Sequence, residues 1–121
     1  MTDMFLVRRM YADEYGTNKL EWVEKDKLPN KLLHAAKILR WREWRHEIKY
    51  VKSVDGFDWE LVIRWWSGMG WFDVATARFD AKGRVEAERR VNPFSKNSSW
   101  CPTNYSTFML MYVHDNKGKD Q

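Results

Sequence analysis

Alternation of apolar and polar residues around a glycine turn constrains this fold more than any other feature of the chain. Residues 48–54 and 59–66 both alternate, and Asp55-Gly56 stands between them. Successive side chains of a strand point to opposite faces, and Asp-Gly favours the tight turn of a hairpin. These residues are therefore predicted to form two antiparallel strands.

The same pattern continues on the C-terminal side of this hairpin. Residues 72–79 and 84–91 alternate around the break Ala81-Lys82-Gly83. The connection Ser67-Gly68-Met69-Gly70 returns the chain from one alternating run to the next, and its glycines allow a tight reversal. Four consecutive antiparallel strands are predicted in the middle of the chain.

The N-terminal third predicts a further hairpin and then the principal helix. Residues 5–11 and 20–23 are typical of strands joined by a polar loop. Pro29-Asn30 opens a segment whose apolar residues recur three and four positions apart, which is the spacing of one helix face. We place the end of this helix near Arg45, with residues 47–53 extended. The apolar face consists of Leu28, Leu32, Ala35, Ala36 and Leu39.

The C-terminal third predicts a loop, a last strand and a tail. Residues 92–104 are rich in proline, asparagine and serine, which favours a loop. Residues 105–115 are expected to form a strand that is apolar on both faces, and residues 115–121 to fray. No repeat or linker divides the chain. The prediction is one α+β domain over residues 1–121, an antiparallel β-sheet of five to seven strands with one principal helix packed on one face.

Composition is typical of a globular protein, with 44% apolar and 31% charged residues. No run approaches the roughly eighteen apolar residues of a membrane span. The single cysteine, Cys101, cannot form an internal disulfide, and the first eleven residues lack the apolar stretch of a secretion signal. We therefore expect a cytoplasmic protein without membrane contact.

Positive charge is concentrated in one segment. Residues 31–52 contain seven lysines and arginines against two acids, Glu43 and Glu47, whereas the whole chain carries a net charge of only +4. A local excess of this kind favours an anionic partner, and a solvated helix face is the alternative interpretation.

Residues 64–72 concentrate aromatic surface. Because neighbours in a strand point to opposite sides, Trp65 and Trp66 cannot both enter one core. We expect Trp65 to face the core and Trp66 to stand on the other side of the sheet, beside Arg64. The core face of this strand is predicted to hold Trp59, Leu61, Ile63 and Trp65.

In the returning strand we place Trp71 on the same face as Ala75, Ala77 and Phe79. The two alanines leave space on that face. Dense packing by a helix or by neighbouring tryptophans is one way to fill it, and a ligand pocket lined by aromatic rings is the other.

Catalytic and metal-binding motifs are not recognisable. Gly68 and Gly70 lack the third glycine of a dinucleotide fingerprint, and a strand rather than a helix is expected to follow them. The three histidines lie far apart, at none of the spacings that recur among zinc ligands. Glu47-Ile48-Lys49 matches only a fragment of a nuclease metal site. We therefore predict no catalytic residue, no metal site and no cofactor, and expect that the protein is not an enzyme.

The leading hypothesis is a small binding protein that engages an anionic partner, either a nucleic acid or a nucleotide-like ligand, through a basic and aromatic-rich surface. Cationic side chains attract phosphates, while tryptophan and arginine stack on unpaired bases. Charge would come from Lys37, Arg40, Arg42 and Arg45, and stacking or specificity from Trp44, Arg64, Trp66 and Arg78.

Two other hypotheses remain open at this stage. In the first, the same tryptophans and arginines anchor a protein-interaction module or an inhibitor of another macromolecule, because these residue types are enriched in binding hot spots. A homodimer could also cover the second face of the sheet. In the other, a small enzyme or carrier holds an apolar ligand in an aromatic-lined cavity near Trp71, Tyr105 and Met109.

Overall fold

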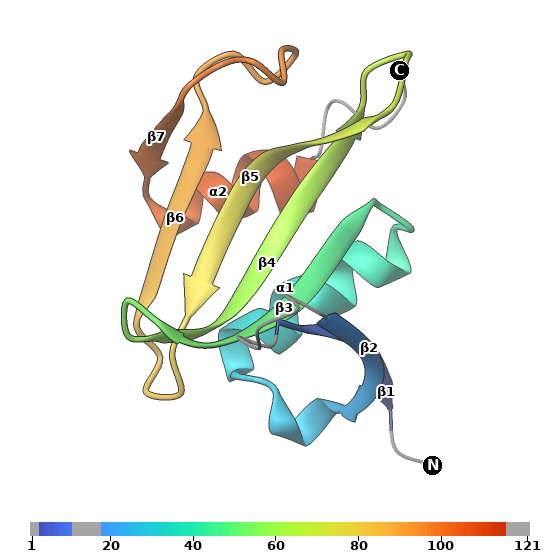
Figure 1. The fold of residues 1–121 in the computed structure, drawn as a ribbon, viewed down its shortest axis with the longest axis vertical. Coiled ribbons are helices and arrows are strands. Elements are labelled where there is room, and N and C mark those ends of the chain that lie inside the picture. Colours follow the sequence, from blue (N-terminus) through green and yellow to red (C-terminus); the bar gives the residue numbers. More distant parts are fainter. Residues whose placement is uncertain (1–2, 11–17, 116–121) are drawn as a thin grey trace.

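The computed structural model describes residues 3–10 and 18–115. Seven strands form one sheet in the order β2-β1-β3-β4-β5-β6-β7, and the helical segments lie on one of its faces (Figure 1). Tyr11 of the predicted first strand, residues 12–17 of the predicted polar loop, and the tail after residue 115 lie outside the described residues. The strands are β1 (Met4–Met10), β2 (Asn18–Glu24), β3 (His46–Val54), β4 (Phe57–Trp66), β5 (Trp71–Phe79), β6 (Val85–Arg90) and β7 (Trp100–Thr103).

The predicted class needs two corrections. The sheet is mixed rather than antiparallel, because β1 and β3 run parallel, in register from Val7 opposite Ile48 to Arg9 opposite Tyr50. The chain between them passes through β2, the short helix η1 (Lys25–Lys27) and α1 (Asn30–Trp41), so α1 carries the chain from the edge strand β2 past β1 to β3. A second helical segment at the C-terminus also covers the sheet, so α1 is not its only helix.

The predicted N-terminal hairpin is confirmed, with β1 and β2 antiparallel over their whole length. The helix α1 ends four residues earlier than we predicted. Glu43 adopts a left-handed backbone (φ 60°), its N–H donates to the Arg40 carbonyl, and the Trp44 N–H donates to the Leu39 carbonyl at 2.9 Å. This is the Schellman arrangement, in which the residue after the left-handed one often packs back onto the helix. Trp44 does so and is buried.

The hairpins of the middle region are confirmed, and the predicted core face of β4 is buried from Trp59 to Trp65. The strand β5 contains a bulge, however. Ile63 lies opposite Ala75 while Arg64 lies opposite Asp73, so Val74 is an extra residue. Beyond such a bulge the alternation of faces is offset by one residue. Trp71 therefore lies opposite Trp66, and the prediction that it shares a face with Ala75 was wrong.

Residues 105–115 form a helical segment rather than the predicted last strand. It consists of α2 (Tyr105–Phe108) and η2 (Met109–Asp115), which has π-helical turns. The Asn104 side chain accepts a hydrogen bond from the Thr107 N–H at 2.7 Å and caps its start. The predicted loop at 92–104 contains the short strand β7, which pairs with β6.

The C-terminal helix closes the core over the small residues of β5 and β6. Phe108 and Tyr112 are fully buried in the same cluster as Ala75, Ala77 and Ala87. Their rings lie 6.0 Å apart, and Tyr112 also contacts Trp65 with a ring separation of 5.8 Å. The space beside the alanines is thus occupied by the protein's own aromatic side chains, as dense packing requires.

Candidate functional site

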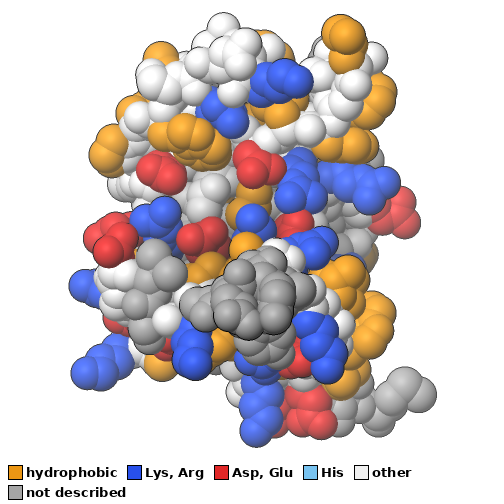
Figure 2. Space-filling model, in the orientation of Figure 1, with side chains coloured by type: hydrophobic (Ala, Val, Ile, Leu, Met, Phe, Trp, Pro, Cys, Tyr) orange, Lys and Arg blue, Asp and Glu red, His pale blue; other side chains and the backbone are white. Residues whose placement is uncertain are grey.

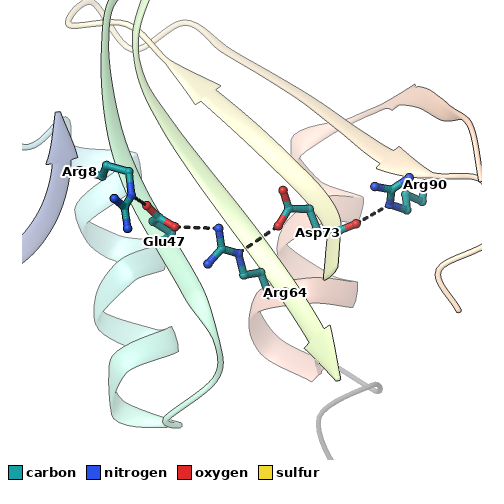
Figure 3. Close-up of polar contacts among 5 residues, drawn as sticks. All are labelled: Arg8, Glu47, Arg64, Asp73 and Arg90. Atoms are coloured by element: carbon teal, nitrogen blue, oxygen red, sulfur yellow. Dashed lines mark hydrogen bonds and ion pairs between the residues drawn. The ribbon is translucent and has the colours of Figure 1, made fainter. Parts of the chain in front are cut away.

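The face of the sheet opposite the helices, which we call the open face, carries acidic and basic side chains in alternation (Figure 2). Arg8, Glu47, Arg64, Asp73 and Arg90 form a ladder across it (Figure 3). The Glu47 carboxylate pairs with Arg8 and with Arg64, whose Nη2 lies 2.7 Å away. The Arg64 Nε donates to the Asp73 carboxylate at 3.0 Å, and the Arg90 Nε donates to the Asp73 carbonyl. Each arginine of the ladder is therefore satisfied within the protein.

Arg78 lies on the same face and is compensated in the same way. It stands opposite Glu60 on one side and Glu86 on the other, and its Nε lies 3.4 Å from the Glu60 carboxylate. It lines a hollow of about 530 Å³ where β7 stops short of the start of β6. Opposite charges in register across neighbouring strands stabilise a sheet, so this pairing has a structural explanation.

Trp66 and Trp71 lie side by side where β4 and β5 meet at their turn. Their ring centres are 5.5 Å apart, and both rings are partly exposed, Trp66 by 37%. The guanidinium of Arg45 lies over Trp71 at 5.1 Å. Arg45 forms no ion pair with any residue in 3–10 or 18–115, and its guanidinium contacts the face of this ring instead.

A second hollow, of about 440 Å³, lies beside these tryptophans near the first residues of β3. Four arginines line it, together with Glu47 and with exposed apolar side chains of β1 and β2. We call it the arginine hollow; its arginines are Arg8, Arg40, Arg45 and Arg64, and its apolar residues include Leu6, Leu20 and Trp22.

The wall of the arginine hollow next to α1 is held by Arg40 and His46. Arg40 donates to the Met4 carbonyl at 2.9 Å and lies over the Phe5 ring at 4.0 Å. The Nδ1 of His46 donates to the Trp44 carbonyl at 2.7 Å. Burial lowers the pKa of His46 below its usual value, and the nearby Arg40 acts in the same direction.

The solvent side of α1 is a separate cationic surface. Residues 30–42 contain four lysines and arginines and no acid. Of these four, only Arg40 forms an ion pair within the described part of the chain, with Asp3 at 3.3 Å. Trp41 stands among them with 81% of its surface exposed. We call this surface the α1 basic face, formed by Lys31, His34, Lys37, Trp41 and Arg42.

The eight residues proposed from the sequence are thus divided between places. Three of them, Arg40, Arg45 and Arg64, line the arginine hollow, and Arg78 lines the hollow beside β6 and β7. Trp66 contacts Trp71, on which Arg45 lies, whereas Lys37 and Arg42 belong to the α1 basic face. Trp44 is a correction, because its ring is buried to 9% exposure under the Arg42 guanidinium and is not free to stack on a ligand.

Four residues at these surfaces were not among the predicted site residues, namely Arg8, Lys31, Trp41 and Trp71. For Trp41 a signal was present, since it falls opposite the apolar stripe of Leu32 and Leu39 on a helical wheel, and Lys31 falls at the flank of that stripe. For Arg8 none was present, because its place in the ladder depends on the parallel pairing of β1 with β3.

Comparisons with models of protein families, with curated proteins and with solved structures find no match to this chain. Among residues 3–10 and 18–115, no three histidine, cysteine or acidic side chains are arranged to hold a metal ion. No helix in the same residues has the length and apolar character that crossing a membrane requires.

Proposed function

We propose that this chain is a non-enzymatic binding protein for nucleic acid and that the α1 basic face is its contact surface. The observation that supports the proposal is the contrast between two sets of cations. The open-face arginines Arg8, Arg64 and Arg78 each have a carboxylate partner. In the part of the chain that the structure describes, Lys31, Lys37 and Arg42 have none.

Electrostatics favours a polyanion for such a surface. Cations without carboxylate partners repel one another, and Lys31 lies in the first turn of α1, where a positive charge opposes the helix dipole. Lys31 lies over the Tyr105 ring at 5.8 Å and Arg42 over the Trp44 ring at 4.9 Å, but neither contact neutralises the positive charge. A phosphate backbone would neutralise these cations and release its own condensed counterions, which is the main source of affinity for nucleic acid.

The shape of the α1 basic face suits a single strand. From Lys31 to Arg42 the helix rises about 16 Å, which is roughly the axial length of five nucleotides. Trp41 is exposed near the C-terminal end of this stretch, where its ring is free to stack on an unpaired base. Such stacking contributes about 1–3 kcal/mol per base with little sequence preference.

Fluorescence anisotropy with labelled single-stranded oligonucleotides at several salt concentrations tests the proposal. We expect affinity to fall with salt at a log–log slope of about −0.7 for each phosphate contacted. Lys31→Glu/Lys37→Glu should weaken binding by tenfold or more, since about 1.4 kcal/mol already corresponds to a factor of ten.

The matched control is Lys82→Glu/Lys96→Glu, which makes the same change in net charge at two exposed lysines in turns outside α1. This variant should keep most of the affinity. Equal losses in both double variants would show that only net charge matters and would contradict a site on α1. Absence of binding by the unaltered protein at low salt would overturn the proposed function itself.

A further inference from the structure

The strand β2 is the outermost strand at one side of the sheet. One of its edges pairs with β1, and no described strand pairs with the other. The strand is seven residues long and contains no proline. Natural proteins usually shield such an edge with proline, a bulge or an inward charge, because its free N–H and C=O groups are a template for another strand.

An apolar patch lies along this edge on the open face. Leu6 of β1 stands directly opposite Trp22 of β2, and Leu20 lies two positions further along β2 on the same side. Their side chains are exposed by 44%, 63% and 49%. Figure 2 shows hydrophobic side chains gathered over β1 and β2. An edge that is both unpaired and apolar is suited to pairing with another strand.

We propose that two copies of the chain associate through antiparallel pairing of their β2 strands, with the twofold axis at Glu21. This register uses all seven residues of β2 in both copies. It places Leu20 opposite Trp22 of the partner subunit and Trp22 opposite Leu20 of the partner subunit. Since Leu6 lies next to Trp22 in each copy, six apolar side chains become one cluster across the joint.

Charge on the other side of β2 supports the same register. Lys19 and Glu21 point away from the open face, so Lys19 would lie diagonally across the joint from Glu21 of the partner subunit, within the range of cross-strand pairs. The two Glu21 side chains would face each other at the axis, but each is already paired with Arg9 of its own chain. Moving the axis to Trp22 would instead place Leu20 opposite Glu24 of the partner subunit.

A second copy fits this edge because two β2 strands in antiparallel orientation place complementary side chains opposite each other. Leucine meets tryptophan in both directions, and lysine meets glutamate on each diagonal. Self-complementarity of this kind is what a twofold interface between identical chains requires. With the axis normal to the sheet, both copies keep their helices on the same side. The two α1 helices would then lie on one side of a continuous double sheet.

Sedimentation equilibrium across a wide range of concentration tests this inference without reference to any ligand. The unaltered protein should approach twice its chain mass of 14.7 kDa. Trp22→Lys places a charge at the centre of the joint and should shift the protein to monomer. Because Trp22 is exposed in the single chain, the variant should keep the circular dichroism spectrum of the parent.

Trp41→Lys is the matched control, since it makes the same exchange at a tryptophan on α1, away from β2. It should remain dimeric. In a Cys101→Ser background, Leu20→Cys/Trp22→Cys should form covalent dimers on oxidation, because each cysteine would face its counterpart across the joint.

A single-chain mass at every concentration would overturn the proposed dimer, and so would an equal effect of the two lysine variants. Neither outcome affects the nucleic-acid proposal, which depends on Lys31 and Lys37 and is measured by anisotropy.

Discussion

The Arg45 guanidinium lies 5.1 Å from the ring centre of Trp71, which itself contacts the edge of Trp66. Arg45 belongs to the connection between α1 and β3, whereas the two tryptophans end β4 and begin β5. The stacked guanidinium therefore links the β4–β5 turn to the end of the helix. It also covers part of an aromatic surface that the bulge at Val74 directs to the open face.

Arg45→Met should destabilise the protein by roughly 0.5–1 kcal/mol, because it removes a cation from an aromatic face but keeps an unbranched side chain on it. The free energy of unfolding in urea measures the effect. Lys96→Met removes a cation from an exposed loop side chain and should change stability by less than about 0.5 kcal/mol. Equal effects in the two variants would show that the stacked cation does not stabilise this link.

Glu47→Gln should lower the free energy of unfolding by roughly 1–3 kcal/mol, which is more than Arg45→Met. Only 12% of the Glu47 side chain is exposed, and its carboxylate is shared by Arg8 and Arg64, so both guanidinium groups lose an anionic partner together. Chemical denaturation measures the loss. Glu86→Gln is the control, since Glu86 is exposed on the same face. A Glu47→Gln protein as stable as that control would mean that the ladder does not hold β1, β3 and β4 together.

The free energy of unfolding should decrease in mild acid, because His46 is protonated more readily in the unfolded chain than in the folded protein. Its pKa in the folded protein is lowered, chiefly by burial, whereas in the unfolded chain it is near the usual value of about 6.5. The unfolded chain therefore takes up a proton first as pH falls. The stabilisation is complete above the unfolded pKa and is lost as pH falls through the folded pKa. Unfolding free energies measured between about pH 7 and pH 5 should vary less in His46→Gln than in the parent.

The stability of the protein should also fall at alkaline pH, because of Tyr105. Burial raises the pKa of Tyr105 to about 12, and its hydroxyl donates to the Lys31 carbonyl at 3.3 Å. The unfolded chain loses this proton near pH 10, so stability is complete below that pH and is lost as pH rises through 12. Burial also raises the pKa of Tyr112, so tyrosinate absorbance should show late titration of both groups, and Tyr105→Phe should remove one part of it. An unchanged titration curve in that variant would contradict the assignment.

The parts of the fold that could be predicted are those that local pattern determines. Alternation and turn residues were sufficient for the β1–β2 hairpin and for β3 to β6, and the apolar stripe of Leu32 and Leu39 was sufficient for α1. Each of these signals lies within about a dozen residues. The side of the sheet taken by Trp65 and Trp66 followed from the same alternation.

The segment at 105–115 was assigned wrongly because its middle, residues 108–113, is entirely apolar. A run of this kind matches a period of two and a period of 3.6 almost equally well. The helical signal was nevertheless present. Asn104 is a favourable N-cap, and the buried residues of α2 and η2 are spaced as a helix face, namely Phe108, Met109, Tyr112 and Val113.

Other features depend on contacts that no local pattern contains. The bulge at Val74 is one residue in an otherwise regular strand, and it alone moved Trp71 to the open face. The ladder through Glu47 requires Arg8 and Arg64, which are 56 positions apart in the sequence, on strands either side of β3. For the candidate sites, the sequence therefore predicted where cations are concentrated but not which of them are neutralised.

The parallel contact between β1 and β3 divides the sheet unevenly. It is registered over three residue pairs, whereas β1 pairs with β2 over seven and β4 with β5 over eight. Local opening follows the weakest line of contacts, so amide exchange in β1 should report separation along this seam before the meander from β3 to β7 loosens. The strand proposed to join two copies is attached to the rest of the sheet only across this seam. Association at β2 and closure of the seam would therefore stabilise one another.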